Sequence, residues 1–415
     1  MIVITINTDR LIQIGVAAAR CNCKMDEYFS STLDKLKSNN YGELSIILGN
    51  ESCDLDSAVS SLVYAIFLHW QYQQIKCKVC TKINRDEDMY KDDIFVPIIN
   101  VDRDDFGLKT EVVYFFNEHG ITAEKLVFRN DLDLQQLVTT KKAKVVLVDH
   151  HTLSNNDKFL APFVVEIIDH RPIDKSSWGY KEDTRSTIET VGSCCTLIAQ
   201  RIKDLAALVA KDVDFFNAYP VCSDMLHSTI ILDTVNFSKD LNKATPHDED
   251  IILFLETLLK PSDYETERKN KLDRLSKAKS DVSSLTAGQL LKKDVKIFGS
   301  VLVPSFPILV QEFLQKPEAQ RALSEALNSR GCSVALLLGM DYKEGMKRDT
   351  AVYSDNAERE AQLSAFIEQW AAPPLGLTPL GPPLPCHYYK QDNLTATRKQ
   401  YIPIINEFLN DKRFI

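Results

Sequence analysis

The chain has 415 residues, of which 44% are hydrophobic and 26% are charged, and its formal net charge is -9. This composition is typical of a folded globular protein, and the length exceeds what one hydrophobic core normally organises, so we expect two domains. No apolar stretch approaches the roughly 20 residues that span a bilayer. The acidic balance argues against a general nucleic-acid-binding surface, because such surfaces need clustered Lys and Arg.

The N-terminal segment is poor in acidic residues. Residues 1–24 contain Arg10, Arg20 and Lys24 but only one carboxylate, Asp9. We interpret this segment as a disordered or strand-like extension, with a weak mitochondrial presequence as the alternative. Ten cysteines in a chain of this length do not indicate a disulfide framework. We therefore expect a cytoplasmic location, or the mitochondrial matrix if the extension acts as a presequence.

An apolar run that ends in oxygen-bearing side chains begins at residue 46, in IILGNESCDLDSAVSSLVYAIF. The run predicts a buried strand, and the carboxyl end of such a strand is where open α/β folds bind ligands. Asn50 follows the strand, and Asp54 and Asp56 can both reach one divalent ion from a turning loop. The alternative is that Asp56 and Ser57 simply cap the helix that follows.

Two later apolar runs end in Asp-His pairs. KVVLVDHH ends in Asp149, His150 and His151, and VVEIIDHRPID contains Asp169 and His170. His and Asp are common metal ligands, and the carboxyl ends of neighbouring parallel strands face one crevice. Polar side chains at three strand ends therefore predict a metal centre.

A further acidic residue, Asp233, lies in the apolar run LHSTIILDTVNF. Burying a carboxylate is costly unless a cation or a hydrogen-bond donor accompanies it. On the residues alone, Asp233 is either another metal ligand or a paired carboxylate of the core. The acidic cluster at residues 102–105 has no Asp-His pair, so we interpret it as the start of a solvated helix.

The chain from residue 25 to residue 245 alternates apolar runs with helical patterns, such as SAVSSLVYAIFLHW and SCCTLIAQRIKDLAALVAK. This alternation predicts a mainly parallel sheet flanked by helices. Gly192 and Ser193 begin the second of these helices, where backbone N–H groups either face an anion or are simply capped.

A change of pattern marks the end of this first domain, because residues 261–285 carry mixed charges at helical spacing. We expect an extension at 1–24, a first domain at 25–245, a helical connector at 246–285 and a second domain at 286–415. KKDVKIF, SVLVPSF and CSVALLLGMDY predict short strands with helices between them, in a smaller α/β domain. Six prolines between residues 373 and 385 predict a loop, which is compatible with a partner-binding motif.

These motifs, in this order, resemble those of the DHH phosphoesterase superfamily. The similar branch holds prune, the yeast-type cytosolic exopolyphosphatase and the manganese-dependent family II inorganic pyrophosphatases, and GNESCDLDS is most similar to prune. The resemblance covers nearly the whole chain from about residue 25. It implies an α/β fold with an N-terminal DHH domain, a smaller DHH-associated domain and an active site in the cleft between them.

The resemblance also implies two divalent metal ions, Mg²⁺ or Mn²⁺. Their ligands would be Asn50, Asp54, Asp56, Asp149, His170 and Asp233. The spacing of the Asp-His pairs matches the pyrophosphatases, which implies that Asp149 bridges the ions and that Asp169-His170-Arg171 is the counterpart of the eponymous triplet. His150 and His151 rank below His170 as ligands, and we assign His150 to the substrate.

Two residues depart from the pyrophosphatase pattern. Asn50 replaces a His, and its amide oxygen shifts the preference toward harder ions, so magnesium becomes as plausible as manganese. Arg171 replaces a second His, and its guanidinium suits holding a phosphate rather than donating a proton. At both positions the residue resembles the one in prune, and both substitutions argue against fast hydrolysis of pyrophosphate.

A basic pair near the C-terminus, in NLTATRKQYIPIINEFL, resembles the Ser-Arg-Lys motif of the second domain, with Thr397 in place of Ser. The resemblance assigns Arg398 and Lys399 to phosphate binding, and Lys296 by a looser alignment. Without the resemblance, two adjacent basic residues before a helix would be a solvated turn.

The implied activity is that of an exopolyphosphatase acting on short-chain polyphosphate. Water activated between the two ions would attack phosphorus, with Asp149 and His170 in the catalytic centre and Arg171, Arg398 and Lys399 stabilising the phosphoryl charge. One alternative is a cyclic nucleotide phosphodiesterase, although no base-stacking aromatic can be assigned near the motifs. The other is a regulatory protein that binds a nucleoside diphosphate kinase, which the two missing histidines favour.

Overall fold

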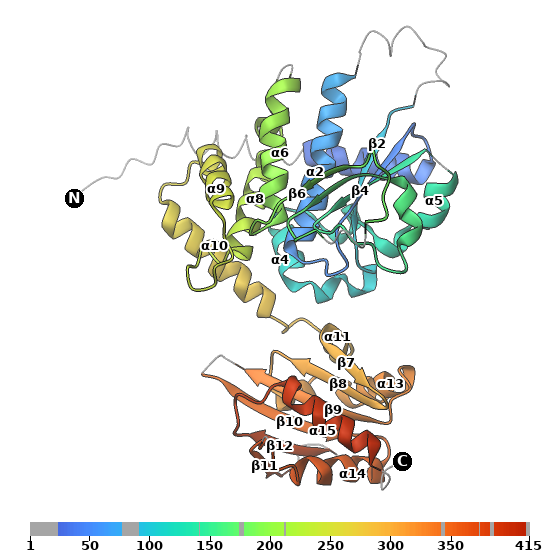
Figure 1. Cartoon of the computed structure of the whole chain (residues 1–415), viewed down its shortest axis with the longest axis vertical. Coiled ribbons are helices and arrows are strands. Elements are labelled where there is room, and N and C mark those ends of the chain that lie inside the picture. The colour runs from blue at the N-terminus through green and yellow to red at the C-terminus, as the bar shows by residue number, and fades with distance from the viewer. Residues whose placement is uncertain are drawn as a thin grey trace, which may run out of the picture. The chain divides into compact units, whose positions relative to one another are not determined.

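The computed structural model describes residues 24–76, 91–140, 142–173, 178–210, 213–341, 345–372, 374–381 and 386–411. The chain divides into two compact units, residues 1–279 (unit 1) and 280–415 (unit 2), and each unit contains one six-stranded sheet (Figure 1). The expected N-terminal extension lies outside the described residues, except for Lys24. Among the described residues, no helix is both long enough and apolar enough to cross a membrane.

The sheet of unit 1 is parallel throughout, in the order β3-β2-β1-β4-β5-β6. Its strands are β1 Leu44–Leu48, β2 Ile94–Ile99, β3 Val127–Phe128, β4 Ala143–Val148, β5 Val164–Asp169 and β6 Arg185–Ile188. The chain moves outward from β1 in one direction to β2 and β3, and in the other to β4, β5 and β6. The strand order therefore reverses between β1 and β4, and a reversal of this kind opens a crevice at the carboxyl ends of the two strands.

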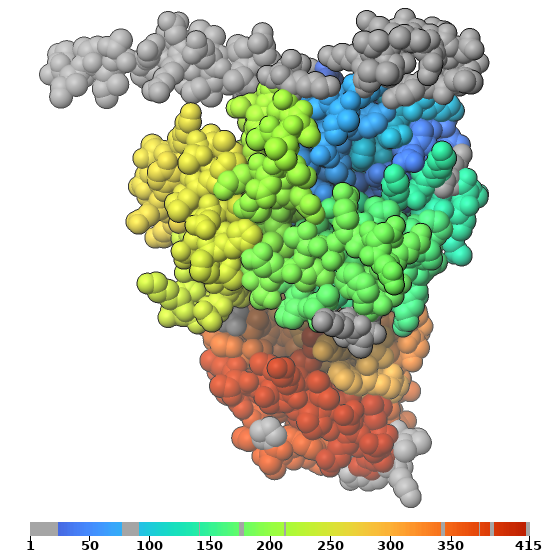
Figure 2. Space-filling view, turned by 45° about the horizontal axis from the view of Figure 1, so that its top comes forward, coloured from blue at the N-terminus to red at the C-terminus, as the bar shows by residue number. Residues whose placement is uncertain are grey.

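Helices cover this sheet, so the expected α/β class is confirmed. The helices are residues 24–38, α2 Leu55–Ile75, α4 Thr110–Glu118, α5 Leu134–Thr140, α6 Cys194–Val209, α7 Phe215–Ala218, α8 Pro220–Asp233, α9 Pro246–Leu259 and α10 Tyr264–Ser280, with short 3₁₀ helices at Arg103–Leu108, Ala123–Lys125, Arg129–Asp131 and Lys158–Phe163. α2 packs against both α6 and α8, and α9, in yellow, lies beside α6, in green (Figures 1 and 2). Residues 102–104 of the acidic cluster are exposed at the start of the 3₁₀ helix Arg103–Leu108, as expected.

The sheet of unit 2 is mixed, in the order β11-β12-β10-β9-β8-β7. Its strands are β7 Val295–Phe298, β8 Val301–Phe306, β9 Val334–Asp341, β10 Lys347–Tyr353, β11 Leu377–Leu380 and β12 His387–Gln391, and its helices are α11 Ala287–Lys293, α12 Val310–Leu314, α13 Ala319–Ser329, α14 Ala357–Glu368 and α15 Arg398–Asn410. Only β8 and β9 pair in parallel; the other pairs are antiparallel.

Two expectations for unit 2 were wrong. No helix separates the first two expected strands, because β7 and β8 form an antiparallel hairpin whose turn contains Gly299 at φ 53°. Part of the proline-rich stretch is not a loop, because residues Leu377–Leu380 form an edge strand, β11, that pairs with β12. An edge strand tolerates Pro379, since one side of its backbone needs no hydrogen-bond partner.

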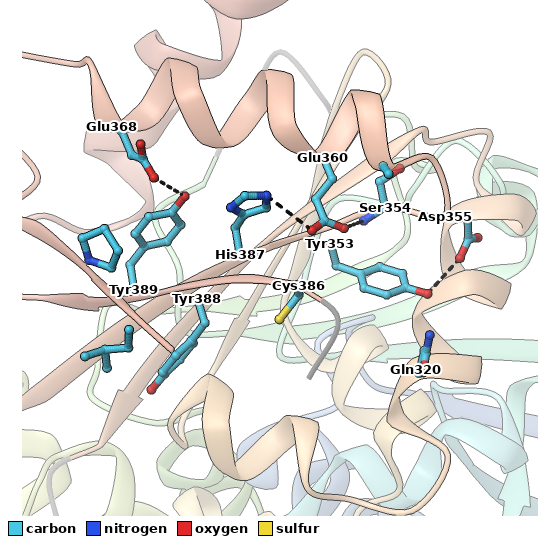
Figure 3. A pocket seen from close by; sticks show the side chains of 13 residues that line it. Gln320, Tyr353, Ser354, Asp355, Glu360, Glu368, Cys386, His387, Tyr388 and Tyr389 are labelled. Carbon is cyan, nitrogen blue, oxygen red and sulfur yellow. Dashed lines mark hydrogen bonds and ion pairs between the residues drawn. The ribbon is translucent and has the colours of Figure 1, made fainter. Parts of the chain in front are cut away.

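A cavity of about 640 Å³ in unit 2 is lined by residues of β10, β12, α14 and their neighbours (Figure 3). The hydroxyl of Tyr353 donates to Asp355 at 2.8 Å, and that of Tyr389 donates to Glu368 at 2.8 Å. Glu360 lies 3.9 Å from His387. None of the lining residues is Lys or Arg, so this cavity has the wrong charge for a phosphate.

A buried charged network ties α10 to α8 and α4. Lys271 of α10 is 3% exposed, and its Nζ donates to Asp224 Oδ1 at 2.6 Å. The other oxygen of Asp224 lies 2.9 Å from His119 Nε2. Although burial opposes ionisation, these two partners hold the pKa of Asp224 well below its usual range.

We predict that Asp224→Ala strongly destabilises unit 1, because it removes the carboxylate 2.6 Å from the buried ammonium of Lys271 and leaves only Glu267, at 3.8 Å, as its counter-charge among the described residues. The cost should be about 3 kcal/mol, which lowers the melting temperature by roughly 6 to 12 °C. A carboxyl whose pKa is lowered by folding stabilises the folded chain above its ordinary pKa of about 3.9, and this effect is lost as the pH falls below it. Thermal melts should therefore show a lower melting temperature for Asp224→Ala than for the wild-type chain near neutral pH, and a smaller difference in acid. Equal melting temperatures for the two chains near neutral pH would contradict the prediction.

Candidate metal and phosphate site

The carboxyl ends of β1, β4 and β5 bring the polar motifs together at the reversal of strand order. Ligand atoms of Asp56, Asp149 and His170 all lie within 4.8 Å of one another. His170 Nε2 lies 3.2 Å from Asp149 Oδ1 and 3.7 Å from Asp56 Oδ2. Three segments that are distant in the sequence thus form one cluster at the carboxyl edge of a single sheet.

The N-terminus of α2 places two of the carboxylates. Asp54, and not Asp56, is the N-cap, and its side chain accepts from Ser57 N at 3.1 Å. The alternative in which Asp56 caps the helix was therefore wrong: Asp56 lies in the first turn and is buried. Its oxygens accept from the backbone N–H groups of Cys194 and Cys195 at 2.7 and 2.9 Å, at the N-terminus of α6.

Asp149 is the central carboxylate of the cluster. Its backbone is left-handed, with φ 62°, a conformation that Asp adopts more readily than most residues and that recurs at functional sites. Its Oδ2 accepts from the amide of Asn50, whereas its buried Oδ1 has no hydrogen-bond partner. The guanidinium of Arg171 approaches Oδ1 to 3.6 Å.

Asn50 contacts the cluster through its nitrogen. Its Nδ2 donates to Asp149, and its Oδ1 accepts from Ser52 N at 2.7 Å. In this orientation Asn50 positions Asp149 and turns its own oxygen away from the cluster. Coordination of a metal by Asn50 stays a prediction, and it requires a rotated amide.

Asp233 is the last residue of α8 and lies near the other carboxylates. Burial, followed by the negative charges of Asp56, Asp54 and Asp149, raises the pKa of Asp233 well above its usual range. Its Oδ2 is buried without a hydrogen-bond partner, and it pairs with no Lys, Arg or His among the described residues. Asp233 is thus not a core carboxylate neutralised by a cationic side chain.

The cluster has the electrostatics of a cation site. Burial and the charge of Asp56 raise the pKa of Asp149 to about 7. Although burial disfavours the imidazolium, Asp149 and Asp56 raise the pKa of His170 to about 10. Asp149 Oδ1 and Asp233 Oδ2 are buried carboxylate oxygens without a hydrogen-bond partner, and divalent cations satisfy such oxygens. The residues present therefore fit the metal ions that the sequence motifs imply.

The other histidines of the motifs have different surroundings. His151 Nδ1 pairs with the buried carboxylate of Asp169, which also accepts from the backbone N–H groups of His170 and Arg171 at 2.8 and 3.2 Å. Asp169 therefore shapes the loop that carries His170. His150 Nδ1 donates to Val148 O at 3.0 Å, and burial lowers the pKa of His150, so its imidazole is neutral near neutral pH.

A cavity of about 290 Å³ opens beside the cluster. It is lined by Asn50, Glu51, Ser52, Asn100, His150, Thr152, Leu153, Ser154, Asp157 and Arg171. Sequence reasoning missed Asn100, whose Nδ2 donates to Gly49 O at 2.8 Å. The sequence does contain a signal for Asn100. It follows the apolar run FVPII, just as Asn50 follows the apolar run that forms β1.

Comparison with known proteins places the chain in a family. The DHHA2 domain family matches residues 273–408. The chain is 33% identical over 374 residues to the mouse protein named "Exopolyphosphatase PRUNE1", with 88% of this chain and 76% of the mouse protein covered. The chain belongs to the prune branch of the DHH phosphoesterase superfamily.

Two more distant matches cover most of the chain. A Schizosaccharomyces pombe protein named "Putative exopolyphosphatase" is 26% identical over 377 residues and covers 87% of this chain and 90% of its own length. A crystal structure of a Methanococcus jannaschii putative family II inorganic pyrophosphatase covers 88% of this chain and 100% of its own, at 20% identity and a TM-score of 0.43. The expectation of a prune-type phosphohydrolase is confirmed by the relatives that are named exopolyphosphatases.

The basic residues of unit 2 that the prune resemblance assigns to phosphate are placed as follows. Thr397 is the N-cap of α15, and Arg398 is its first residue. Arg398 Nη2 donates to Asp294 Oδ1 at 2.7 Å, while Lys399 is exposed and Lys296 is exposed on β7. Their role in phosphate binding stays a prediction.

Proposed function

We propose that the chain is a metal-dependent exopolyphosphatase that hydrolyses phosphoanhydride bonds of short-chain polyphosphate. The observation that carries the proposal is the convergence of Asp56, Asp149 and His170 beside a cavity that Arg171 lines. The names of the prune relatives support the same class of substrate.

The ligands would hold two divalent ions, Mg²⁺ or Mn²⁺, with Asp149 between them. Asp54, Asp56, His170 and Asp233 would complete the set. When bound, such ions lower the pKa of a coordinated water and neutralise charge on a phosphoryl group. His170 is oriented for this role, because its Nδ1 lies 2.9 Å from Val191 O, which leaves Nε2 free to face the carboxylates.

Arg171 would bind the phosphoryl oxygens. Its side chain is 48% exposed, lines the cavity and lies near Asp149. A guanidinium stays charged at all accessible pH values, so it neutralises a leaving group but does not protonate it. A leaving phosphate is a stable anion that needs no proton, whereas the alkoxide that leaves from a phosphodiester does. Arg171 therefore favours anhydride hydrolysis over cyclic nucleotide hydrolysis.

The lining of the cavity favours an inorganic substrate as well. None of its lining residues is Phe, Tyr or Trp. Enzymes that bind nucleotides commonly stack the base on such a ring. The polar side chains instead suit phosphate oxygens.

Initial rates test this proposal. Tripolyphosphate, tetraphosphate and a cyclic nucleotide would be compared with Mg²⁺ and with Mn²⁺ as the only divalent ion. We expect kcat/KM for tetraphosphate to exceed that for the cyclic nucleotide by about 10-fold or more, in line with the loss of a group that protonates the leaving alkoxide. A higher kcat/KM for the cyclic nucleotide would overturn the assignment.

We predict that Arg171→Ala lowers kcat/KM for tetraphosphate by about 100-fold, because one charged donor to the transferred group is removed. Arg171→Lys should recover only part of the loss, since an ammonium lacks the paired donors of a guanidinium. Arg321→Ala is a matched control, because Arg321 is 70% exposed and lies in unit 2. Equal rates for Arg171→Ala and the wild-type chain would rule out this role.

A further inference from the structure

We propose that Asp248, which lies outside the four sequence motifs, is a positioning residue of the metal site. It fixes the segment at residues 191–193, and this segment orients both His170 and Asp56. The inference rests on the proposed metal site and adds a residue that controls its affinity for metal.

Asp248 is fully buried and accepts four hydrogen bonds. Its Oδ2 accepts from Thr245 N and Thr245 Oγ1, both at 2.7 Å, and the bond from Thr245 N is one half of the capping box of α9. The same oxygen accepts from Gly192 N at 2.8 Å, and Oδ1 accepts from Thr196 Oγ1 at 2.6 Å. A helix cap explains the first two contacts, but not the two that reach across the structure to the start of α6.

The segment that Asp248 holds contacts two members of the cluster. On one side of Gly192, the carbonyl of Val191 lies 2.9 Å from His170 Nδ1. On the other side, Ser193 Oγ donates to Asp56 Oδ1 at 2.9 Å. A shift of Gly192 would therefore rotate the imidazole of His170 and, at the same time, move the Ser193 hydroxyl that donates to Asp56.

Gly192 is closely enclosed, so neighbouring atoms restrict the position of the segment. A Cβ atom added at Gly192 would lie 2.7 Å from Thr234 Cγ2 and 3.1 Å from Asp248 Oδ2. Thr234 directly follows Asp233, the carboxylate at the end of α8. The segment is thus fixed between Asp248 and the end of the helix that carries Asp233.

The direct test is the Mn²⁺ affinity of the full chain, measured by isothermal titration calorimetry. Asp248→Asn keeps the size of the side chain but removes its negative charge. The NH₂ group of the amide would also face one of the groups that now donate a hydrogen bond to Asp248. We expect it to weaken Mn²⁺ binding by about 10- to 100-fold, as removal of outer-sphere partners of metal ligands does. Hydrolysis at saturating Mn²⁺ should be less affected than the Mn²⁺ concentration that gives half of the maximal rate.

Thr245→Ala is the matched control, because it removes the helix cap but leaves the contacts of Asp248 with Gly192 and Thr196. It should lower the melting temperature and leave Mn²⁺ affinity within about 2-fold of the wild-type value, since cap losses act on helix stability. If Thr245→Ala weakens Mn²⁺ binding as much as Asp248→Asn does, the effect is only structural and the proposal is wrong. An unchanged affinity of Asp248→Asn would also overturn it.

Thr196→Val keeps the test informative if Asp248→Asn does not fold. It removes only the hydrogen bond to Oδ1, and we expect Mn²⁺ binding to weaken by about 3-fold or more, a smaller loss than that of a complete outer-sphere partner. Wild-type affinity in Thr196→Val would then overturn the proposal. Failure of the wild-type chain to bind Mn²⁺ would instead contradict the proposed function itself, so the two failures are distinguishable.

Discussion

Asp149→Asn should lower the hydrolysis of tetraphosphate by about 1,000-fold or more, because Asp149 is the carboxylate that the proposed ions share. The substitution keeps the shape of the side chain and an oxygen that can accept from Asn50. It removes the negative charge of the carboxylate, which would help to hold the second cation. Steady-state rates at saturating Mg²⁺ and Mn²⁺ measure the effect.

The same variant should not be less stable than the wild-type chain when metal is absent. Burial and Asp56 raise the pKa of Asp149 to about 7, so the ionised carboxylate destabilises the metal-free fold. Asp204→Ala, at an exposed position on α6, is the matched control and should leave the rate unchanged. A wild-type rate in Asp149→Asn would remove the hydrolase assignment; loss of the rate with a nucleoside diphosphate kinase still bound would separate hydrolysis from that predicted partnership.

Removal of divalent metal should abolish hydrolysis and also lower the melting temperature. Bound ions neutralise the buried carboxylates, and a ligand present at 100 times its dissociation constant stabilises a protein by about 2.7 kcal/mol. The melting temperature of the chain should therefore fall by roughly 5 to 10 °C after chelation. Addition of Mg²⁺ or Mn²⁺ should restore both the rate and the melting temperature.

The stabilisation by metal should grow with pH. The metal must displace protons from Asp149, whose pKa is raised to about 7, and from His170, whose pKa is raised to about 10. Both protons compete with metal at lower pH, so affinity rises as they leave. The difference in melting temperature with and without metal should be larger at roughly pH 8 than at roughly pH 6; the opposite trend would show that these residues do not bind the metal.

The fold and the convergence of the motifs could be predicted because they depend on backbone periodicity. The apolar runs before Asn50, Asp149 and His170 predict parallel strands, and parallel strands present their carboxyl ends at one edge. Nothing more than hydrophobic pattern and polar strand ends was needed to expect Asp149 and His170 in one crevice.

The finer arrangement of the site depends on contacts that the pattern does not encode. Asp54 and Asp56 are chemically alike, and only the extended backbone at Asp54, with ψ -176°, makes it the cap. The direction of the Asn50 amide is set by Ser52. Asp248 was not recognised, because its contacts with Gly192 lie 56 positions away in the sequence.

The proline-rich stretch shows a similar limit. Pro379 lowers the propensity for a strand, and the sequence gives no sign that β12 offers an edge with which residues Leu377–Leu380 can pair. Tertiary pairing therefore outweighed local preference at this position.

Anomalous diffraction from Mn²⁺-soaked crystals of the full chain tests the central claim most directly. The account predicts two peaks on either side of the Asp149 carboxylate, with oxygens of Asp56 and Asp149 at about 2.0 to 2.6 Å from an ion, the range for hard cations. Asp54, His170 and Asp233 should complete the coordination. Mn²⁺ bound elsewhere in a chain that hydrolyses tetraphosphate, with these side chains left free of metal, would contradict it.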